Sequence, residues 1–146
     1  MTTIAYKNGI VAADGLAGVD NLIVSNNEKK IFVINRGIVA GCGNFAEINK
    51  MVQWLASCED LNTDQPRVNS TVILFTPKKI TVFEKTCYFH ESPKKYFAWG
   101  SGDMIAMGAM AHGATAIEAV RVACKLDIHS GGKIRWKKFT NTGRKK

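Results

Sequence analysis

The sequence lacks the features that mark membrane-spanning and secreted disulfide-rich proteins. It contains no uninterrupted run of about 18 apolar residues, so no transmembrane helix is predicted. The N-terminus has none of the charged, apolar and small-residue regions of a secretory signal. The 4 cysteines include no Cys-x-x-Cys pair, which favours reduced, mostly buried thiols. These absences together predict a cytoplasmic protein.

A complete set of metal ligands is also missing. Cys87 and His90 have the spacing of one half of a zinc site, but no second pair supplies the remaining ligands. We therefore expect no metal and no other cofactor.

Acidic residues are absent from the C-terminal segment 133–146, which carries 7 of the 20 basic residues. The net charge of +8 therefore leaves 8 − 7 = +1 for the rest of the chain. A basic tail over residues 140–146 can neutralise phosphates or contact an acidic surface, although a solvated terminus is the simpler interpretation. Nucleic acid is not expected to be the partner of the main activity.

What the sequence does contain fits one domain, residues 1–139, followed by this tail. A length of 146 residues with 46% hydrophobic content is enough for a buried core. Period-2 apolar runs predict strands, and Lys7-Asn8-Gly9 between the first two runs predicts a hairpin. Period-3.6 runs predict helices, and Asn44 with Glu47 and Thr115 with Glu118 have the spacing of capping boxes. The predicted strands are Thr3–Tyr6, Ile10–Ala13, Lys30–Ile34, Ile38–Gly41, Thr71–Phe75, Ile80–Glu84, Cys87–His90, Tyr96–Trp99 and Lys133–Phe139. The predicted helices run from Asn44 to near Cys58 and from Asp103 to Gly113, and a third begins at Thr115 and carries Ile117, Val120 and Cys124 on one face; a polar loop is predicted over 59–69.

The residues that suggest chemistry begin at the N-terminus. Removal of Met1 would leave Thr2 with a free α-amine, so that one residue would supply both a hydroxyl nucleophile and a base. Further polar and glycine residues follow at intervals. They are Asp14, Lys30, the Gly41-Cys42-Gly43 turn, Gly100-Ser101-Gly102, and Asp127-Ile128-His129-Ser130-Gly131-Gly132.

Taken singly, each of these features has an ordinary structural explanation. Asp14 before a glycine is typical of a turn, and Ser101 is typical of a helix cap. Lys30 could be a surface lysine. Only the ordered combination points to catalysis.

That combination resembles the proteasome β-subunits and the bacterial HslV peptidase, which are N-terminal nucleophile hydrolases, from Thr2 to about Phe139. The resemblance implies an α+β fold, a four-layer αββα sandwich with two antiparallel sheets between helices. Its first helical layer would be reduced, because one helix and the segment 59–69 stand where the family has two helices. It also implies that Met1 removal alone exposes the nucleophile.

The resemblance assigns roles to seven catalytic residues. Thr2 would attack a peptide carbonyl and form an acyl-enzyme, and the backbone N–H of Gly43 would bind the oxyanion. Lys30, held charged by Asp14, would disfavour protonation of the Thr2 amine. Ser101, Asp127 and Ser130 would orient that amine and a water molecule.

The resemblance also implies a substrate pocket and partners. Gly41, Phe45 and Asn49 would line the pocket, and the small Gly41 predicts an open pocket for bulky apolar or long side chains. The substrate would be a peptide or an unfolded protein, the assembly a homo-oligomeric ring, and the partner an ATPase unfoldase. Two alternatives remain open, a catalytically silent scaffold subunit and a nucleic-acid-associated protein that uses its basic tail.

Overall fold

The computed structural model describes residues 2–85, 87–91 and 95–139. Met1 and the tail 140–146 lie outside the described residues, so the predictions for them stay untested. The elements within the described residues are β1 (Thr3–Lys7), β2 (Ile10–Ala13), β3 (Ala17–Val19), β4 (Leu22–Ser25), β5 (Ile31–Ile34), β6 (Gly37–Cys42), α1 (Phe45–Ser57), β7 (Val68–Phe75), β8 (Ile80–Lys85), β9 (Cys87–Glu91), β10 (Tyr96–Gly100), α2 (Asp103–Ala111), α3 (Ala116–Leu126) and β11 (Arg135–Lys138).

The first sheet places the N-terminal strand at its centre. Its four strands lie in the order β10-β1-β2-β11, and all neighbours are antiparallel. The β1–β2 hairpin turns at Asn8 and Gly9, with φ of 52° and 80°. Two consecutive positive φ angles are the signature of the hairpin turn that Asn-Gly favours. This turn confirms the predicted hairpin and brings Asp14 beside the start of β1.

The second sheet is an antiparallel meander of five strands in the order β5-β6-β7-β8-β9. It confirms the strand pairs predicted from the apolar runs. Its register is irregular at one point, between Val68 and Thr71 of β7, where the pairing with β8 shifts. This bulge lies opposite the end of β6, the strand that carries the glycine turn.

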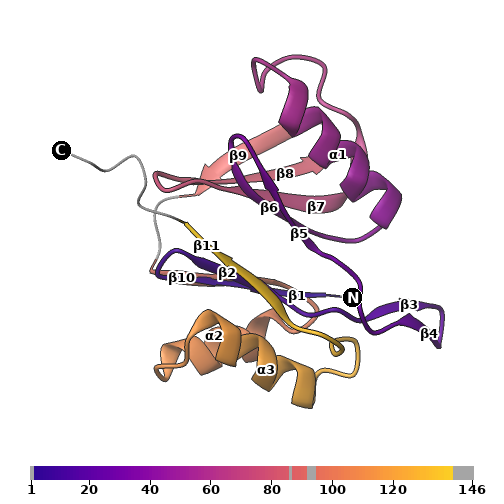
Figure 1. Ribbon diagram of the computed structural model, residues 1–146, viewed down its shortest axis with the longest axis vertical. Coiled ribbons are helices and arrows are strands. Elements are labelled where there is room, and N and C mark those ends of the chain that lie inside the picture. Colours follow the sequence, from indigo (N-terminus) through magenta and orange to yellow (C-terminus); the bar gives the residue numbers. More distant parts are fainter. Residues whose placement is uncertain (1, 86, 92–94, 140–146) are drawn as a thin grey trace.

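The two sheets pack face to face, and helices cover their outer faces (Figure 1). Side chains from both sheets, including Ile4, Ile73 and Phe75, form the core between them. The small side chains of β1 and β2 contact α2 and α3, while Ile48, Met51 and Leu55 of α1 pack on the other sheet. The prediction of a mixed fold with two antiparallel sheets and flanking helices is confirmed.

The helix boundaries follow the predicted caps with one correction. In α3, Thr115 and Glu118 form a reciprocal capping box, as predicted. In α1, Asn44 accepts a hydrogen bond from the Glu47 N–H, but the Glu47 carboxylate binds Asn69 and Ser70 instead. The capping box predicted for Asn44 and Glu47 is therefore wrong, because partners in β7 take the carboxylate.

Three further features of the strands differ from the prediction. The hairpin β3–β4 was not predicted, since its apolar residues do not alternate with polar ones and remain exposed. β7 begins at Val68, within the segment 59–69 predicted as a loop, and the closing strand is Arg135–Lys138, shorter than predicted. None of the helices in the described part of the chain has the length and hydrophobicity needed to cross a bilayer.

Candidate active site

A buried ion pair lies beside the start of the N-terminal strand. The Lys30 ammonium is 2.9 Å from Asp14 Oδ1, and the two residues are only 2% and 1% exposed. Lys30 also donates to the Leu16 carbonyl at 2.7 Å. Charged residues are almost never this buried unless they are paired, so Lys30 is not an ordinary surface lysine.

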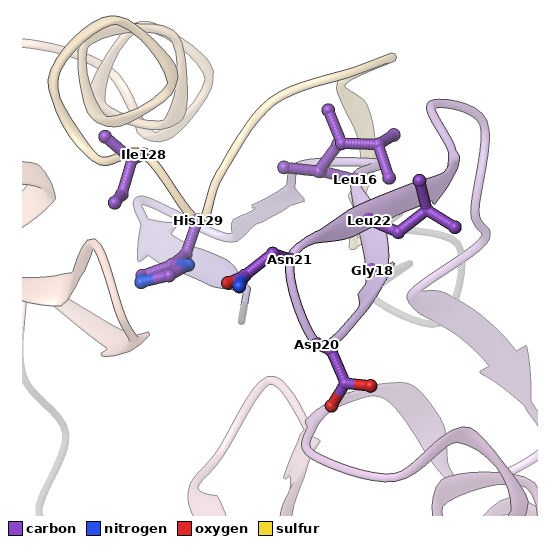
Figure 2. Close-up of a pocket in the computed structure, with 8 residues that line it drawn as sticks. Leu16, Gly18, Asp20, Asn21, Leu22, Ile128 and His129 are labelled. Atoms are coloured by element: carbon purple, nitrogen blue, oxygen red, sulfur yellow. The ribbon is translucent and has the colours of Figure 1, made fainter.

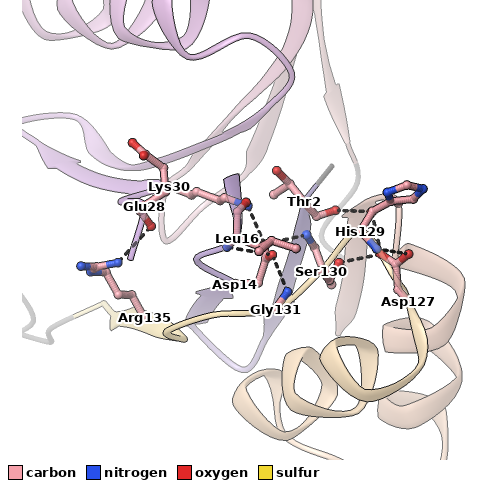
Figure 3. Close-up of polar contacts among 12 residues, drawn as sticks. Thr2, Asp14, Leu16, Glu28, Lys30, Asp127, His129, Ser130, Gly131 and Arg135 are labelled. Atoms are coloured by element: carbon pink, nitrogen blue, oxygen red, sulfur yellow. Dashed lines mark hydrogen bonds and ion pairs between the residues drawn. The ribbon is translucent and has the colours of Figure 1, made fainter. Parts of the chain in front are cut away.

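Asp14 is held by the backbone on both carboxylate oxygens (Figure 3). Its Oδ1 accepts from the Thr3 N–H at 3.0 Å, and its Oδ2 accepts from the N–H groups of Gly131 at 3.0 Å and Leu16 at 3.3 Å. These donors come from β1, from the loop after β2 and from the loop after α3. Asp14 therefore joins three parts of the chain, and the turn interpretation does not account for it.

A second polar cluster forms at the C-terminal end of α3. Asp127 Oδ2 accepts from the hydroxyls of Ser101 and Ser130, each at 2.6 Å, and Oδ1 accepts from the His129 N–H at 3.1 Å. Partial burial raises the pKa of Asp127, but these hydrogen bonds from Ser101, Ser130 and His129 outweigh it and leave the pKa below its ordinary value. The Asp127 carboxylate is thus stabilised in its ionised form.

Thr2 lies between the two clusters. It is 3% exposed, and its carbonyl accepts from the Ser101 N–H at 2.8 Å. Two glycines make this approach possible. A side chain at Gly100 would collide with the Thr2 carbonyl, and one at Gly102 would collide with the Thr3 hydroxyl. The Gly-Ser-Gly segment is therefore required by the close passage of the N-terminal strand.

Thr3 connects the clusters, and the sequence analysis did not identify it. Its N–H binds Asp14, and its hydroxyl lies 2.7 Å from that of Ser130. Thr3 is fully buried. A polar side chain in the first strand, on the face that should be apolar, was the only sequence signal that could have indicated this.

The glycine turn is placed by β6. Gly43 has φ of 130° and follows β6 directly, so it adopts a conformation that favours glycine. Cys42, the residue before it, is half-buried, and burial raises its thiol pKa while the positive charge of Lys30 lowers it. Among the described residues, no hydrogen bond joins Gly43 to either cluster.

The predicted substrate residues lie at the end of β6 and in α1. A side chain at Gly41 would lie 2.9–3.2 Å from the atoms of Ile48 in α1. Ile48 therefore occupies the side of Gly41 toward which a side chain would point, and the pocket predicted at this glycine stays a prediction. Phe45 is half-buried against the core under α1, and Asn49 is exposed on the helix.

Open space occurs instead beside the loop that follows α3. A cavity of about 240 Å³ lies between the β3–β4 hairpin and this loop, lined by Leu16, Leu22, Ile128 and His129 among others (Figure 2). A second cavity of about 400 Å³ reaches Asp127 and Ser130. A ligand in this region can contact the second polar cluster.

A metal centre has no candidate ligands in the part of the chain that the structure describes. No group of three or more histidine, cysteine or acidic side chains occurs there in a suitable arrangement. The side chains of Cys87 and His90, which gave the half-site spacing, lie outside the description.

Comparison with known proteins gives structural matches only. No family model matches the chain, and no curated protein matches it significantly in sequence. The solved structure of BPH from Thiobacillus denitrificans in complex with epoxomicin is similar, with a TM-score of 0.69 and 21% identity over 93% of this chain and 96% of that chain. HslV from Trypanosoma brucei is similar as well, with a TM-score of 0.69 and 17% identity over 92% of this chain and 97% of that chain.

Both matches span nearly the whole of each chain, so the similarity extends beyond a shared motif. At these identities the likeness concerns the fold. It agrees with the resemblance to proteasome β-subunits and HslV that the ordered motifs indicate, and this chain has the HslV-type fold.

Proposed function

We propose that this chain is a threonine-type peptidase whose nucleophile is Thr2, exposed by removal of Met1. The observation that carries the proposal is the position of Thr2 between a buried Asp14–Lys30 pair and the Ser101–Asp127–Ser130 cluster. A buried cation paired with a buried carboxylate is an unusual feature for a strand end. It is a common feature of sites that tune a nucleophile.

In the proposed reaction, Thr2 Oγ1 attacks the carbonyl carbon of a peptide bond. The Thr2 α-amine accepts the hydroxyl proton and then delivers it to the departing amine of the substrate, which leaves an ester between Thr2 and the acyl group. Water then hydrolyses the ester with the same amine as base, and Thr2 is regenerated. An α-amine has a reference pKa of about 7.7–8.0, so it can act as a base near neutral pH.

The two clusters would serve different parts of this cycle. The Lys30 ammonium, close to the start of β1, would disfavour protonation of the amine by charge repulsion, and Asp14 holds Lys30 in place through the ion pair. Asp127, with Ser101 and Ser130, would orient the amine and the hydrolytic water through hydrogen bonds. The Gly43 N–H would bind the developing oxyanion, a contribution typically worth about 2.7–4 kcal/mol per donor.

The proposed peptidase function extends to the layers of the fold, the substrates and the partners. The stacking of α1, two sheets, and α2 with α3 corresponds to the four-layer αββα sandwich of N-terminal nucleophile hydrolases, with α1 as a reduced first layer. Peptides or unfolded proteins would be the substrates, Gly41, Phe45 and Asn49 would border the substrate site, and the chain would act in the cytoplasm. A homo-oligomeric ring and an ATPase unfoldase would be its partners.

The test combines intact mass with labelling by a peptide epoxyketone, which reacts with both the hydroxyl and the α-amine of an N-terminal threonine. The wild-type protein should lack Met1 and gain one adduct. Thr2→Ala should gain none, while Thr2→Ser, which keeps a hydroxyl and a free amine, should still react.

Two outcomes would contradict the proposal. A retained Met1 with no adduct would support the silent scaffold, because the amine would then be part of an amide. An adduct that persists in Thr2→Ala would place the nucleophile elsewhere.

A further inference from the structure

The glycine turn at Gly43 and Asn44 is held by the side chains around it, and the role assigned to them rests on the proposed function. Gly43 and Asn44 connect the end of β6 to the start of α1, and Gly43 itself is exposed. An exposed backbone turn is free to change direction unless side chains fix it. An oxyanion donor has to be fixed in advance, because its value depends on a preset direction.

Ser70 lies directly against this turn. A side chain added to Gly43 would come within 2.7 Å of Ser70 Cβ, so the two residues are in close contact. The Ser70 hydroxyl accepts a hydrogen bond from the Asn44 N–H at 2.8 Å, and Ser70 as a whole is only 4% exposed. The serine therefore ties down the backbone N–H that follows Gly43.

Glu47 in turn holds the serine. The Ser70 hydroxyl donates to Glu47 Oε1 at 2.7 Å, and the Asn69 N–H lies 3.2 Å from both carboxylate oxygens. Glu47 also donates its own N–H to Asn44 Oδ1 at 3.1 Å. Asn44, Ser70 and Glu47 thus form a closed ring of hydrogen bonds around the turn, which we call the turn clamp.

The bulge in β7 explains how Ser70 reaches the turn. The pairing of β7 with β8 shifts between Val68 and Thr71, so Asn69 and Ser70 are the residues outside the regular register. Bulges redirect side chains, and they are common next to active sites. Here the bulge leaves the Asn69 N–H for Glu47 and turns Ser70 toward Gly43.

The ionised form of Glu47 is the one that fits the clamp. Hydrogen bonds from the Ser70 hydroxyl and the Asn69 N–H lower the pKa of Glu47 below its ordinary value. Helix α3 supplies a comparison, since its Glu118 folds back on its own cap at Thr115. In helix α1 the Glu47 carboxylate does not make the corresponding contact, because Asn69 and Ser70 bind it.

The two backbone N–H groups of the turn differ in their hydrogen bonding. The Asn44 N–H is taken by Ser70, whereas the Gly43 N–H has no hydrogen-bond partner among the residues that the structure describes. We propose that Glu47 and Ser70 are positioning residues that hold the turn so that the Gly43 N–H is free and correctly directed for the oxyanion.

The experiment measures peptide hydrolysis and backbone exchange in the full-length chain, with Ser70→Ala, Glu47→Ala, Glu47→Gln and the control Glu118→Ala. Ser70→Ala should lower kcat roughly 10- to 100-fold with little change in KM, because oxyanion binding acts in the transition state. Glu47→Ala should have a smaller effect in the same direction. Glu47→Gln, which keeps an acceptor oxygen for Ser70, should recover most of that loss.

Glu118→Ala is the matched control, since it removes a carboxylate from the same position of another helix without touching the turn. It should lower thermal stability and leave kcat unchanged. Amide hydrogen exchange gives a readout that does not depend on activity. The Asn44 N–H should exchange faster in Ser70→Ala, and the Asn69 N–H should exchange faster in Glu47→Ala.

The outcomes separate the two proposals. An inactive wild type that takes no epoxyketone adduct overturns the proposed function, and exchange at Asn44 and Asn69 then still decides whether the clamp holds the turn. An active wild type with Ser70→Ala and Glu47→Ala at the level of the control overturns the inference alone. If Ser70→Ala does not fold, Glu47→Ala and Glu47→Gln give the same comparison.

Discussion

The two polar clusters that meet at the N-terminal strand differ in their access to water. The Asp14–Lys30 pair is almost completely buried, while Ser101 and His129 are exposed and Asp127 is partly so. A buried pair has to be electrically complete within the protein, because each charge alone would be strongly unfavourable there. The open cluster can lose or gain contacts with solvent and ligand. We therefore expect the buried pair to matter for both stability and chemistry, and the open cluster to matter mainly for chemistry.

The loop after α3 belongs to both clusters, which makes the contrast informative. Within five residues it supplies Asp127 and Ser130 to the open cluster and the Gly131 N–H to Asp14. Variants on either side of this loop test whether the division is real. The prediction is that a change in the buried pair lowers both stability and activity, whereas a change in the open cluster lowers mainly activity.

The largest effect should come from Lys30→Met, which keeps the apolar part of the side chain and removes the charge. It leaves the Asp14 carboxylate buried without a cation, which typically destabilises a protein by about 3–5 kcal/mol. Labelling by the epoxyketone should also be lost. Urea denaturation and intact mass measure the two effects.

The double variant Asp14→Asn with Lys30→Met refines this first prediction. Removing both members of a buried pair often restores stability, but here both carboxylate oxygens accept backbone N–H groups. The amide nitrogen of asparagine would face at least one of these donors, so only part of the loss should be recovered. Full recovery would mean that the pair contributes to stability through its charges alone.

The second effect is expected from Asp127→Asn in the open cluster. Stability should fall by only about 1 kcal/mol, because the site is partly exposed and hydrogen bonding is partly retained. The rate of labelling should fall roughly 10²-fold, the lower range for loss of a group that assists proton transfer. A stability loss as large as that of Lys30→Met, measured in the same urea series, would contradict the separation of the clusters.

The parts that the sequence predicts well are those set by short-range rules. Two such features are the turn at Asn8 and Gly9 and the capping box of Thr115 and Glu118. In each feature the residues lie within four positions of one another, and both features are found as predicted. The polar clusters could be anticipated only through the ordered family motifs. Asp14 and Lys30 are 16 residues apart, and Ser130 and Thr3 are 127 apart.

The features that were not predicted depend on contacts across the fold. The Glu47 carboxylate binds Ser70, 23 residues away, because of a bulge that no local pattern indicates. The closeness of Gly41 to the Ile48 side chain also depends on how α1 packs beside β6, which no local pattern indicates. The β3–β4 hairpin keeps Leu22 and Ile23 exposed, so its residues lack the alternation that identifies a half-buried strand.

Smaller effects should distinguish the two serines within the open cluster. Ser130 is buried and contacts both Asp127 and Thr3, whereas Ser101 is exposed. Ser130→Ala should therefore destabilise the protein by about 1 kcal/mol and Ser101→Ala by about 0.5 kcal/mol. Because both hydroxyls donate to the same oxygen, the two losses should not add. Thermal unfolding of the two single variants and the double variant measures this coupling, and strict additivity would contradict a shared cluster.

The smallest effect should be a pH dependence confined to the open cluster. The hydrogen bonds that lower the pKa of Asp127 favour its ionised form in the folded state, so the unfolded chain binds the proton first as pH falls. Their contribution to stability is then complete above the unfolded pKa of about 3.9 and is lost as pH falls through the lower folded pKa. The difference in free energy of unfolding between wild type and Asp127→Asn should be constant at neutral pH and become smaller below about pH 4.

Removing both serine donors should abolish most of that narrowing of the free-energy difference, since the two serines supply hydrogen bonds that lower the pKa of Asp127. A narrowing that persists without them would assign the effect to another group, and the open cluster would then not be the part of the site that responds to solvent.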